Sequence, residues 1–402
     1  MISIKDIEQA RKILKGIIIE KDFIKSEFLS EYFKTDIYLK LENLQKTGSF
    51  KIRGAYNCIS HIAEKDRKRG VVTASAGNHA QSVAYACLSF GIKATVVMPQ
   101  GTPLTKVRSC KSFEAETIFY GRTYDEAYEK ALEICREKKQ IFVHAFDDYN
   151  VIAGQGTIGL EILDQPEDID IIVVPIGGGG LISGVSIAIK EKKPSIKIIG
   201  VEAAEAASAF LSRKQGKIVH LPMVKTIADG IAVKSVGVKT FQIIEKYVDD
   251  IVIVNEEEIA EAILMFMEQG KLTVEGAGAA PLAALLGEKI NFKSKKVVLI
   301  ISGGNIDVNM VARIIERGLL RAGRFTRIVI DIDDIPGALA EIAGIVGQAE
   351  ANILHIVHER AASNIPFGKT RVKLDLETRG YDHIKELIDR LKSNNFNVTI
   401  EA

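Results

Sequence analysis

Cysteine and net charge are both scarce in this chain. Its four cysteines, Cys58, Cys87, Cys110 and Cys135, include no C-x-x-C pair, so the sequence favours neither a zinc ribbon nor a disulfide scaffold. The 53 basic residues exceed the 52 acidic residues by one, which leaves no positive surplus for binding nucleic acid. Residues 1–15 mix charges throughout and lack the apolar core of a signal peptide. These absences predict a reduced, cytoplasmic, soluble protein.

A long uncharged run raises the question of a membrane span. Residues 171–189 carry no charged side chain, and this length is close to the roughly 20 residues that cross a bilayer. Pro175 and four consecutive glycines at 177–180 interrupt the run. A lipid-exposed helix broken there would leave backbone groups unsatisfied. We therefore predict a buried strand at 171–174, a glycine loop and a helix from about 181, with no membrane span.

Most of the chain alternates apolar runs of strand length with helical stretches. Strands buried on both faces that alternate with helices are typical of a parallel, doubly wound sheet. The 402 residues also allow two or three domains. The predicted strands include 94–98, 171–174, 197–201 and 297–301, and the predicted helices include 126–138 and 256–268.

After about residue 320 the pattern changes to strands of alternating polarity. Alternation indicates a sheet with one face covered by helices, unlike the sheet before it. Glycines at 318 and 323 mark residues 318–326 as the expected linker. The predicted order is βαββαβ, which is ferredoxin-like, with strands at 327–333, 352–357, 370–376 and 396–400 and helices at 338–348 and 383–393.

The glycine run at 177–181 follows a predicted strand and opens a helix. Bare backbone N–H groups at a helix N-terminus form an anion site, most often for phosphate. No Lys-Ser/Thr pair follows, which excludes a Walker P-loop. A dinucleotide site stays open, because Glu202 lies about twenty residues on, although Ser183 replaces the third glycine of that fingerprint. A tight packing turn is the plain structural alternative.

Three further segments carry chemistry-bearing residues. Lys51 stands between Phe50 and Ile52, and apolar neighbours lower the pKa of a lysine toward Schiff-base chemistry. S-A-G-N-H at 75–79 offers backbone donors and an amide for a carboxylate, or forms only an N-capped turn. S-G-G-N at 302–305 follows the last strand of the sheet, at the end where open α/β sheets bind ligands.

Together these segments resemble a known family. S-F-K-x-R-G-A, S-A-G-N-H, G-G-G-G-L and S-G-G-N resemble the motifs of fold-type II pyridoxal-phosphate enzymes, in particular the threonine dehydratases (threonine ammonia-lyases), with serine racemases next. The resemblance covers residues from about 5 to 320, including V-I-A-G-Q-G-T at 151–157 and T-I-A-D-G at 226–230. Residues 325–402 resemble an ACT domain, a small amino-acid-sensing module.

The resemblance implies a tryptophan synthase β-like catalytic region at 1–320. This region would consist of two doubly wound open-sheet domains. A small domain of about 41–145 would be inserted into a large domain formed by about 1–40 and 146–320. The ferredoxin-like ACT domain at 325–402 would be regulatory.

The resemblance also assigns roles to single residues. Lys51 would hold pyridoxal 5'-phosphate as a Schiff base and then act as the base on the α-carbon of the substrate. Phe50 and Gly230 would flank the cofactor ring, Asn78 would bond the ring hydroxyl, and Ser302 would face the pyridine nitrogen. Two loops complete the site: Gly177, Gly178, Gly179, Gly180 and Leu181 for the phosphate, and Ser75, Ala76, Gly77, Asn78 and His79 for the substrate carboxylate.

A cation site is implied at a separate position. Glu202 and the carbonyl of Ala206 fall where the family binds a cation. Relatives that hold a divalent ion have an acidic residue where this chain has Ser208. The choice between a monovalent ion, a divalent ion and no ion therefore stays open.

Two positions narrow the expected reaction. A hydroxyl at Ser302 does not stabilise a protonated pyridine nitrogen, so prompt loss of a β-leaving group is favoured over a long-lived carbanion. The racemases that this chain resembles have a serine where Ala76 stands, and alanine has no proton to give. We expect elimination from L-threonine, and from L-serine, to a 2-oxo acid and ammonia. The alternatives are a serine racemase or other fold-type II enzyme, a nicotinamide-dependent dehydrogenase and a non-catalytic amino-acid sensor.

The resemblance also implies partners. The substrate would be a small amino acid, and isoleucine or valine would bind the ACT domain as an effector. The protein would form a homotetramer or a homodimer. A biosynthetic role, in making isoleucine, and a catabolic role are both compatible with the sequence.

Overall fold

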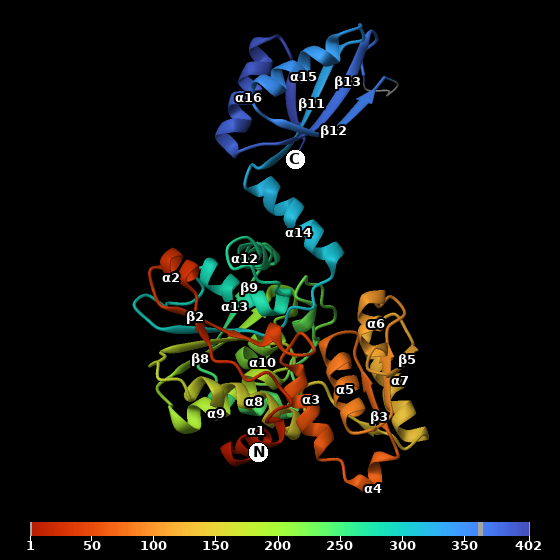
Figure 1. The fold of residues 1–402 in the computed structure, drawn as a ribbon, viewed down its shortest axis with the longest axis vertical. Coiled ribbons are helices and arrows are strands. Elements are labelled where there is room, and N and C mark those ends of the chain that lie inside the picture. The colour runs from red at the N-terminus through yellow and green to blue at the C-terminus, as the bar shows by residue number, and fades with distance from the viewer. Residues whose placement is uncertain (1, 361–364, 402) are drawn as a thin grey trace. The chain divides into compact units, whose positions relative to one another are not determined.

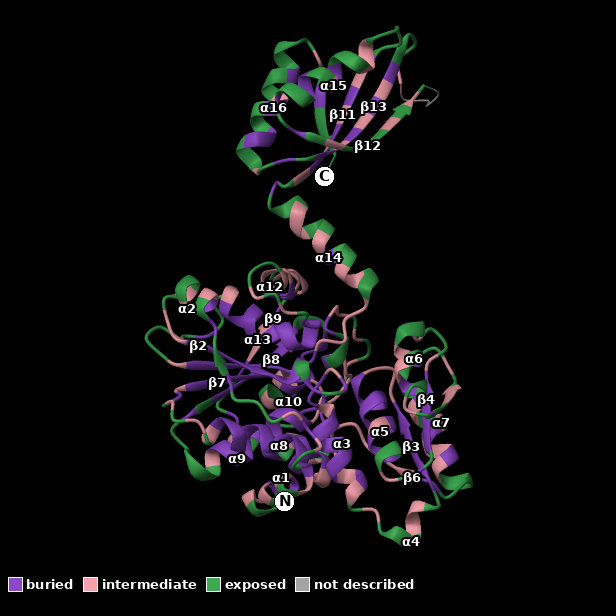
Figure 2. Ribbon diagram, in the orientation of Figure 1, coloured by how far each residue is buried: buried purple, intermediate pink, exposed green. Residues whose placement is uncertain are grey.

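The computed structural model describes residues 2–360 and 365–401. The chain divides into two compact units, Met1–Met310 and Val311–Ala402. Within the described residues, the first unit contains two sheets and the second contains one (Figure 1). Buried residues concentrate in the strands of the first unit and in the helices that face them (Figure 2).

The larger sheet of the first unit has six strands. All neighbouring strands are parallel except β1, which runs antiparallel to β2 at the edge. The interior strands are buried along most of their length, as expected for a doubly wound sheet, and this confirms the predicted fold class. The strand order is β1 (Ile24–Lys25), β2 (Ile37–Leu41), β10 (Val297–Ile301), β7 (Ile171–Pro175), β8 (Lys197–Ala203) and β9 (Asp250–Val254).

Helices cover both faces of this sheet (Figure 1). Two of them approach closely because Gly184 has no side chain: a Cβ there would lie 2.3 Å from the carbonyl oxygen of Ile152. One face carries α1 (Ile4–Leu14), α8 (Tyr149–Leu163), α9 (Gly180–Lys192) and α11 (Val238–Tyr247), and the other carries α12 (Glu256–Glu268) and α13 (Gly276–Leu286). Two shorter helices are α2 (Glu27–Phe33) and α10 (Ser208–Gln215).

The smaller sheet has four parallel strands. Helices α5 and α7 pack against β3 and β4, and α3 packs on α5. The strand order is β5 (Glu116–Phe119), β4 (Ala94–Met98), β3 (Val71–Ala74) and β6 (Ile141–Phe142). The helices are α3 (Lys51–Ser60), α4 (Glu64–Arg67), α5 (Asn78–Ser89), α6 (Leu104–Lys111) and α7 (Tyr124–Glu137).

The second unit has the predicted βαββαβ order. Burial alternates along β11, where Ile328, Ile330 and Ile332 face the core beneath the two helices. The antiparallel strand order is β12 (Asn352–Glu359), β13 (Lys369–Glu377), β11 (Phe325–Asp333) and β14 (Val398–Glu401). The helices are α15 (Ala338–Gln348) and α16 (Tyr381–Ser393).

The predicted linker at 318–326 is partly wrong. Helix α14 spans Val308–Arg321, and it includes Gly318, one of the two glycines that predict the linker. One glycine inside a helix costs only about 1 kcal/mol relative to alanine, so apolar residues at helical spacing override it. The two compact units divide between Met310 and Val311.

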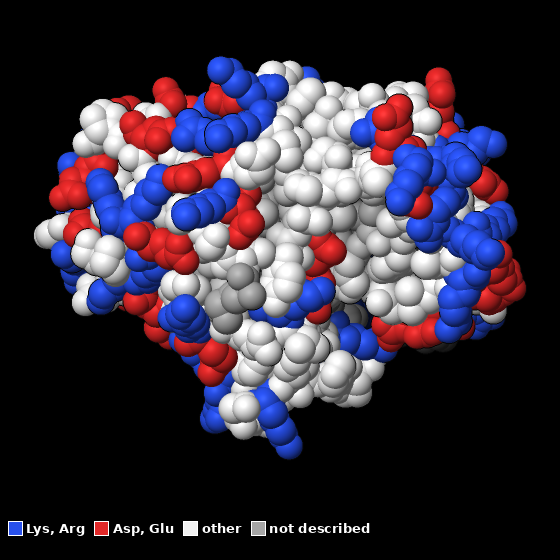
Figure 3. Space-filling model, turned by 90° about the horizontal axis from the view of Figure 1, so that it is seen from below, with Lys and Arg blue, Asp and Glu red and all other residues white. Residues whose placement is uncertain are grey.

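The uncharged run at 171–189 is shared between β7 and α9, with the glycine loop between them. No helix in the described part of the chain combines the length and apolarity needed to cross a membrane. On the face of the molecule shown in Figure 3, basic and acidic side chains are interspersed, with an uncharged band between them.

Candidate active site

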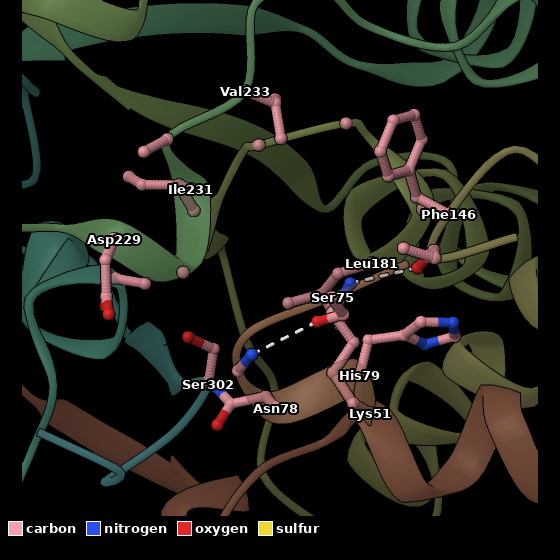
Figure 4. Close-up of a pocket in the computed structure, with 18 of the residues that line it drawn as sticks. Lys51, Ser75, Asn78, His79, Phe146, Leu181, Asp229, Ile231, Val233 and Ser302 are labelled. Atoms are coloured by element: carbon pink, nitrogen blue, oxygen red, sulfur yellow. Dashed lines mark hydrogen bonds between the residues drawn. The ribbon is translucent and has the colours of Figure 1, made fainter. Parts of the chain in front are cut away.

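A pocket of about 300 Å³ lies at the carboxyl ends of strands from both parallel sheets. The loops after β3, β7 and β10 line it, together with the first turn of α3 (Figure 4). Open α/β sheets bind ligands at this edge. The pocket wall includes every residue predicted to contact cofactor or substrate: Phe50, Lys51, Ser75, Ala76, Gly77, Asn78, His79, Gly177, Gly178, Gly179, Gly180, Leu181, Gly230 and Ser302.

Lys51 is the first residue of α3 and directs its ammonium group into the pocket. Its Nζ donates a hydrogen bond to the carbonyl oxygen of Ala145 at 2.9 Å and lies 5.2 Å from the centre of the Phe50 ring. Loss of solvation lowers the pKa of Lys51 to about 8, although the charge of Glu275 acts in the opposite direction. About a tenth of this amine is therefore neutral and nucleophilic at pH 7, far more than for a solvated lysine.

Backbone contacts join the Lys51 segment to the loop after β10. The Phe50 N–H donates to the carbonyl oxygen of Ser302 at 3.0 Å, and Ser49 forms an isolated β-bridge with Gly303. Ser302 is almost fully buried, with 1 % of its surface exposed. These main-chain bonds hold the backbone of Ser302 beside the backbone segment that leads into Lys51.

The glycine loop forms the N-terminus of α9. Gly179 is the N-cap with φ +90°, a conformation that favours glycine. A Cβ at Gly178 would lie 2.2 Å from the ring of Phe146, so no side chain fits there. The free N–H groups at the start of this helix favour an anion.

The loop 75–79 presents mainly backbone groups to the pocket. The Gly77 N–H donates to Ser75 Oγ at 3.2 Å, and the ring of His79 is directed away from Ser302 (Figure 4). Burial lowers the pKa of His79 to about 3, so the ring is neutral and its Nε2–H donates to the carbonyl oxygen of Val143. Contact with a substrate carboxylate would therefore come from loop N–H groups and Ser75, because the His79 ring is occupied elsewhere.

Glu202 and Ala206 lie outside this pocket. The Glu202 carboxylate accepts hydrogen bonds from the N–H groups of Ala209 and Phe210, at 2.8 and 2.7 Å. Burial raises the pKa of Glu202 to about 8. Because this carboxylate is buried against α10, it is not available to bind the ribose of a dinucleotide.

The surroundings of Glu202 resemble no multi-carboxylate metal site. Across residues 2–360 and 365–401, no three His, Cys, Asp or Glu side chains form a cluster that could hold a metal ion. The Oγ of Ser208 is buried and has no hydrogen-bond partner within that described part.

Several pocket residues were missed by the sequence reasoning. Glu275 precedes an otherwise apolar helix, and only this isolation of a charged residue could have singled it out. Asn305 lies within the S-G-G-N segment, but its contacts are not visible in a local pattern. Lys106 forms an ion pair with Asp229 at the pocket, and Phe146 packs over the glycine loop.

The pocket fits pyridoxal phosphate on physical grounds. It contains a lysine whose pKa is lowered by burial, a glycine loop at a helix N-terminus where a side chain would clash, and a buried serine hydroxyl. These groups match the aldehyde, the phosphate and the pyridine nitrogen of that cofactor in turn.

Comparisons with known proteins agree with this fit. Residues 15–303 match the model of the family described as pyridoxal-phosphate dependent enzyme. The chain is 50 % identical over 400 residues to an L-threonine ammonia-lyase of Thermotoga maritima, and the match covers 100 % of both chains.

Solved structures with the same fold include both lyases and racemases. The processed form of threonine deaminase isoform 2 from Solanum lycopersicum has a TM-score of 0.74 and 38 % identity, covering 79 % of this chain and 87 % of its own. Maize serine racemase has a TM-score of 0.74 and 34 % identity, covering 79 % of this chain and 98 % of its own. The extent of these matches decides against the dinucleotide alternative, and the chain belongs to the family of pyridoxal-phosphate dependent enzymes.

Proposed function

We propose that this protein converts L-threonine to 2-oxobutyrate and ammonia, and L-serine to pyruvate and ammonia. The observation that carries the proposal is the placement of the Lys51 amine in one pocket with the glycine loop and Ser302. The full-length relative from Thermotoga maritima, an L-threonine ammonia-lyase, supports the same activity.

Pyridoxal phosphate, when bound, supplies an electron-withdrawing ring that stabilises negative charge at the α-carbon of the substrate. Backbone N–H groups of 177–181 would hold its phosphate, while Phe50 and Gly230 would flank its ring. Ser302 would face its pyridine nitrogen. The family resemblance implies these roles, and the presence of each residue in the pocket wall supports them.

Lys51 has two tasks in this proposal. Its Nζ would hold the cofactor covalently until the amino group of the substrate displaces it, and the released amine would then take the α-proton of the substrate. The β-hydroxyl would take up one proton and leave as water, which balances the α-proton gained by Lys51. The remaining enamine would convert to its imine form, and addition of water to this imine would release ammonia and the 2-oxo acid. The lowered pKa of Lys51 suits both tasks, because each requires a neutral amine.

The test is direct. Protein loaded with pyridoxal phosphate should form 2-oxobutyrate and ammonia in equal amounts from L-threonine. Absence of 2-oxo acid from both L-threonine and L-serine would overturn the proposal.

Racemisation is the competing reaction of the same fold. Reprotonation from the face opposite the lysine needs a proton donor, and Ala76, which lines the pocket, has only a methyl group. We expect Ala76→Ser to produce D-serine from L-serine without abolishing elimination. Chiral analysis of recovered serine measures this, and D-serine formation by the parent protein at the same rate would contradict it.

We also propose that residues 325–402 form an ACT domain that binds an amino-acid effector, isoleucine or valine. The turn before α15 exposes Ile335, and Gly337 caps the helix with φ +94°. N–H groups at such a helix start are suitable partners for a carboxylate.

Truncation separates regulation from catalysis. A chain that ends at Arg324 should keep its activity but lose any response to isoleucine and valine. In typical allosteric proteins the coupling free energy between effector and substrate sites is about 1–3 kcal/mol, roughly 5–150-fold in affinity. Isothermal titration of the full chain should show binding of one of these amino acids. An unchanged response after truncation would exclude the tail as the sensor.

For the cation site, we infer that any ion beside Glu202 and the Ala206 carbonyl is monovalent. Glu202, with Ser208 in place of a second acidic residue, supplies at most one negative charge, which is too little for a divalent ion. Activity should then depend on K⁺ or Na⁺ and should survive EDTA. Loss of activity in EDTA with recovery on addition of Mg²⁺ would contradict this inference.

We propose in addition a cytoplasmic location and a homotetramer or homodimer. The four cysteines are free thiols, which suits a reducing compartment. Light scattering coupled to gel filtration measures the oligomeric state, and a monomer would contradict the proposal.

A further inference from the structure

Three polar side chains of the pocket wall form a row centred on Asn78. Asn78 Nδ2 donates to the carboxylate of Glu275, at 2.8 Å from Oε1 and 3.0 Å from Oε2. Asn78 Oδ1 accepts a hydrogen bond from Asn305 Nδ2 at 2.7 Å. The same Asn305 nitrogen donates to the carbonyl oxygen of Thr47 at 2.8 Å. The amide of Asn78 is therefore held at both ends.

Glu275 is an unusual residue for the interior. It is 2 % exposed, and within the described residues no lysine or arginine forms an ion pair with it. It is the N-cap residue of α13, yet its side chain makes no capping bond and reaches across to Asn78 instead. A buried carboxylate is costly unless it is hydrogen-bonded, so its position calls for a role beyond packing.

Glycines clear space for this row. A Cβ at Gly303 would lie 2.4 Å from Glu275 Oε1, and one at Gly230 would lie 3.0 Å from the same oxygen. A Cβ at Gly48 would lie 2.4 Å from Asn305 Oδ1. The absence of side chains at these three positions thus leaves room for the three polar side chains.

The geometry leaves one donor of Asn78 uncommitted. A side-chain amide has two N–H groups and one oxygen, and the oxygen already faces Asn305. One N–H directed between the two carboxylate oxygens serves both contacts with Glu275. The second N–H is then free, and the carboxylate polarises it because hydrogen bonds in a chain strengthen one another.

We propose that Glu275 and Asn305 are positioning residues that orient the free N–H of Asn78 toward the ring hydroxyl of pyridoxal phosphate. The proposal rests on the contact between Asn78 and that hydroxyl, proposed from the family resemblance. It adds two residues, from α13 and from the loop after β10, whose action reaches the cofactor only through Asn78.

The environment of Glu275 supports this role. Burial and the charge of Asp229 raise the pKa of Glu275, while Asn78, Lys106 and Lys51 lower it, and the result is about 7. The carboxyl group is therefore partly ionised near neutral pH. When it is ionised, its bond to Asn78 is charge-assisted and about twice as strong as a neutral one.

The experiment compares holoenzyme variants by the absorbance and retention of the bound cofactor. Asn78→Ala tests the underlying contact, and Glu275→Gln and Asn305→Ala test the positioning. We expect all three to weaken the visible band of the cofactor in favour of the near-ultraviolet band. We also expect about tenfold faster loss of cofactor on dilution, the value of one charge-assisted hydrogen bond.

Asn43→Ala is the matched control. Asn43 is also a buried amide, and it bonds the carbonyl oxygen of Thr273, two residues before Glu275, without contacting Asn78. Its spectrum and cofactor retention should equal those of the parent. Asn305 is only partly buried, so its variant keeps the test decisive even if Glu275→Gln fails to fold.

The outcomes distinguish the positioning role of Glu275 and Asn305 from the proposed contact between Asn78 and the cofactor. If Asn78→Ala changes the spectrum while Glu275→Gln and Asn305→Ala behave like Asn43→Ala, the positioning role is overturned and the Asn78 contact stands. If Asn78→Ala leaves the spectrum unchanged, the contact itself is wrong, and the inference falls with it. Neither result would alter the proposed conversion of L-threonine.

Discussion

Two buried clusters of charged residues each include a side chain from the first turn of α3, Lys51 in one and Arg53 in the other, and they are built in opposite ways. Arg53 is fully buried and paired with Glu42 and Glu161, while Glu161 also pairs with Lys40. Lys51 faces the pocket, where its Nζ bonds only a backbone carbonyl oxygen. One cluster has two positive and two negative charges in contact, and the other leaves its amine without an ion-pair partner among the described residues.

The pKa values reflect this difference. Burial alone would lower the pKa of Arg53, but the carboxylates of Glu42 and Glu161 raise it above its ordinary value. Burial would raise the pKa of Glu161, and Arg53 and Lys40 lower it instead. For Lys51 burial dominates, and the pKa falls to about 8. Ion pairing thus keeps the side chains of the Arg53 cluster charged near neutral pH. Lys51, which has no such partner, can change its protonation state in that range.

The largest expected effect comes from Lys51→Ala. Within the proposed function, this variant should lose covalent retention of the cofactor and essentially all 2-oxobutyrate formation, because no other group takes its place. Its free energy of unfolding without cofactor should fall by no more than about 1 kcal/mol, since no ion pair is lost. Dialysis followed by absorbance, an activity assay and urea unfolding measure the three quantities. Retained yellow colour together with activity would show that Lys51 is not the reactive lysine.

Arg53→Met should instead lower the free energy of unfolding strongly and leave covalent binding of the cofactor intact. Removing this guanidinium leaves Glu42 and Glu161 buried with unbalanced charge, and breaking such a cluster costs about 3–5 kcal/mol. The variant should still bind cofactor covalently where it is folded. Urea unfolding at pH 7 measures the loss.

An exposed ion pair provides the control for Arg53→Met. Arg379 and Glu350 form such a pair at 2.6 Å, with side chains 62 % and 73 % exposed. Arg379→Met should leave the free energy of unfolding close to that of the parent, because solvent screens an exposed ion pair. Equal losses in the two variants would mean that burial does not set the difference between the clusters.

The sequence predicted the reactive lysine of one cluster but not the ion pairs of the other, because only the first leaves a local pattern. Continuous apolar runs predicted β4 and β10 with their observed bounds, because burial on both faces leaves a local pattern. Lys51 was found because its apolar and glycine neighbours are adjacent in sequence. The partners of Arg53 were not found, since Glu161 lies 108 residues away. Glu275 lies 197 residues from Asn78, and no local pattern encodes such pairings.

The rate of cofactor binding should depend on pH through Lys51 and not through the Arg53 cluster. Only the neutral amine of Lys51 attacks the aldehyde, so the rate of reconstitution should rise about tenfold per pH unit up to pH 8 and level off above it. The paired cluster should contribute nothing in this range, because the pKa of Arg53 is raised and that of Glu161 is lowered.

Stopped-flow absorbance after mixing apoprotein with pyridoxal phosphate measures this profile. Glu275, whose pKa is raised to about 7, titrates in the same window and faces Lys51. Glu275→Gln removes this second titration and isolates that of Lys51. A midpoint near pH 10 in that variant would show that Lys51 is not desolvated in solution.

Within the paired cluster, a smaller effect than that of Arg53→Met should come from Thr157→Val, at the edge of the cluster. Thr157 Oγ1 accepts a hydrogen bond from Arg53 Nη1 at 3.0 Å and donates one to the carbonyl oxygen of Gly154 at 2.6 Å. Valine preserves the shape but removes both hydrogen bonds, although Arg53 Nη1 keeps its bond to Glu161, so the change should cost about 1–3 kcal/mol of stability. The ion pairs of Arg53 persist, so the loss should stay below that of Arg53→Met, and cofactor retention and kcat should stay within about twofold.

Thr157→Ser keeps the hydroxyl and should restore most of the stability. Urea unfolding of both variants, with kcat measured on the same preparations, tests whether the paired cluster acts on stability alone. A large fall in kcat for Thr157→Val, restored in Thr157→Ser, would mean that the Arg53 cluster also sets the position of Lys51 through the first turn of α3. The two clusters would then form one functional unit, and the Arg53 cluster would contribute to catalysis as well as to stability.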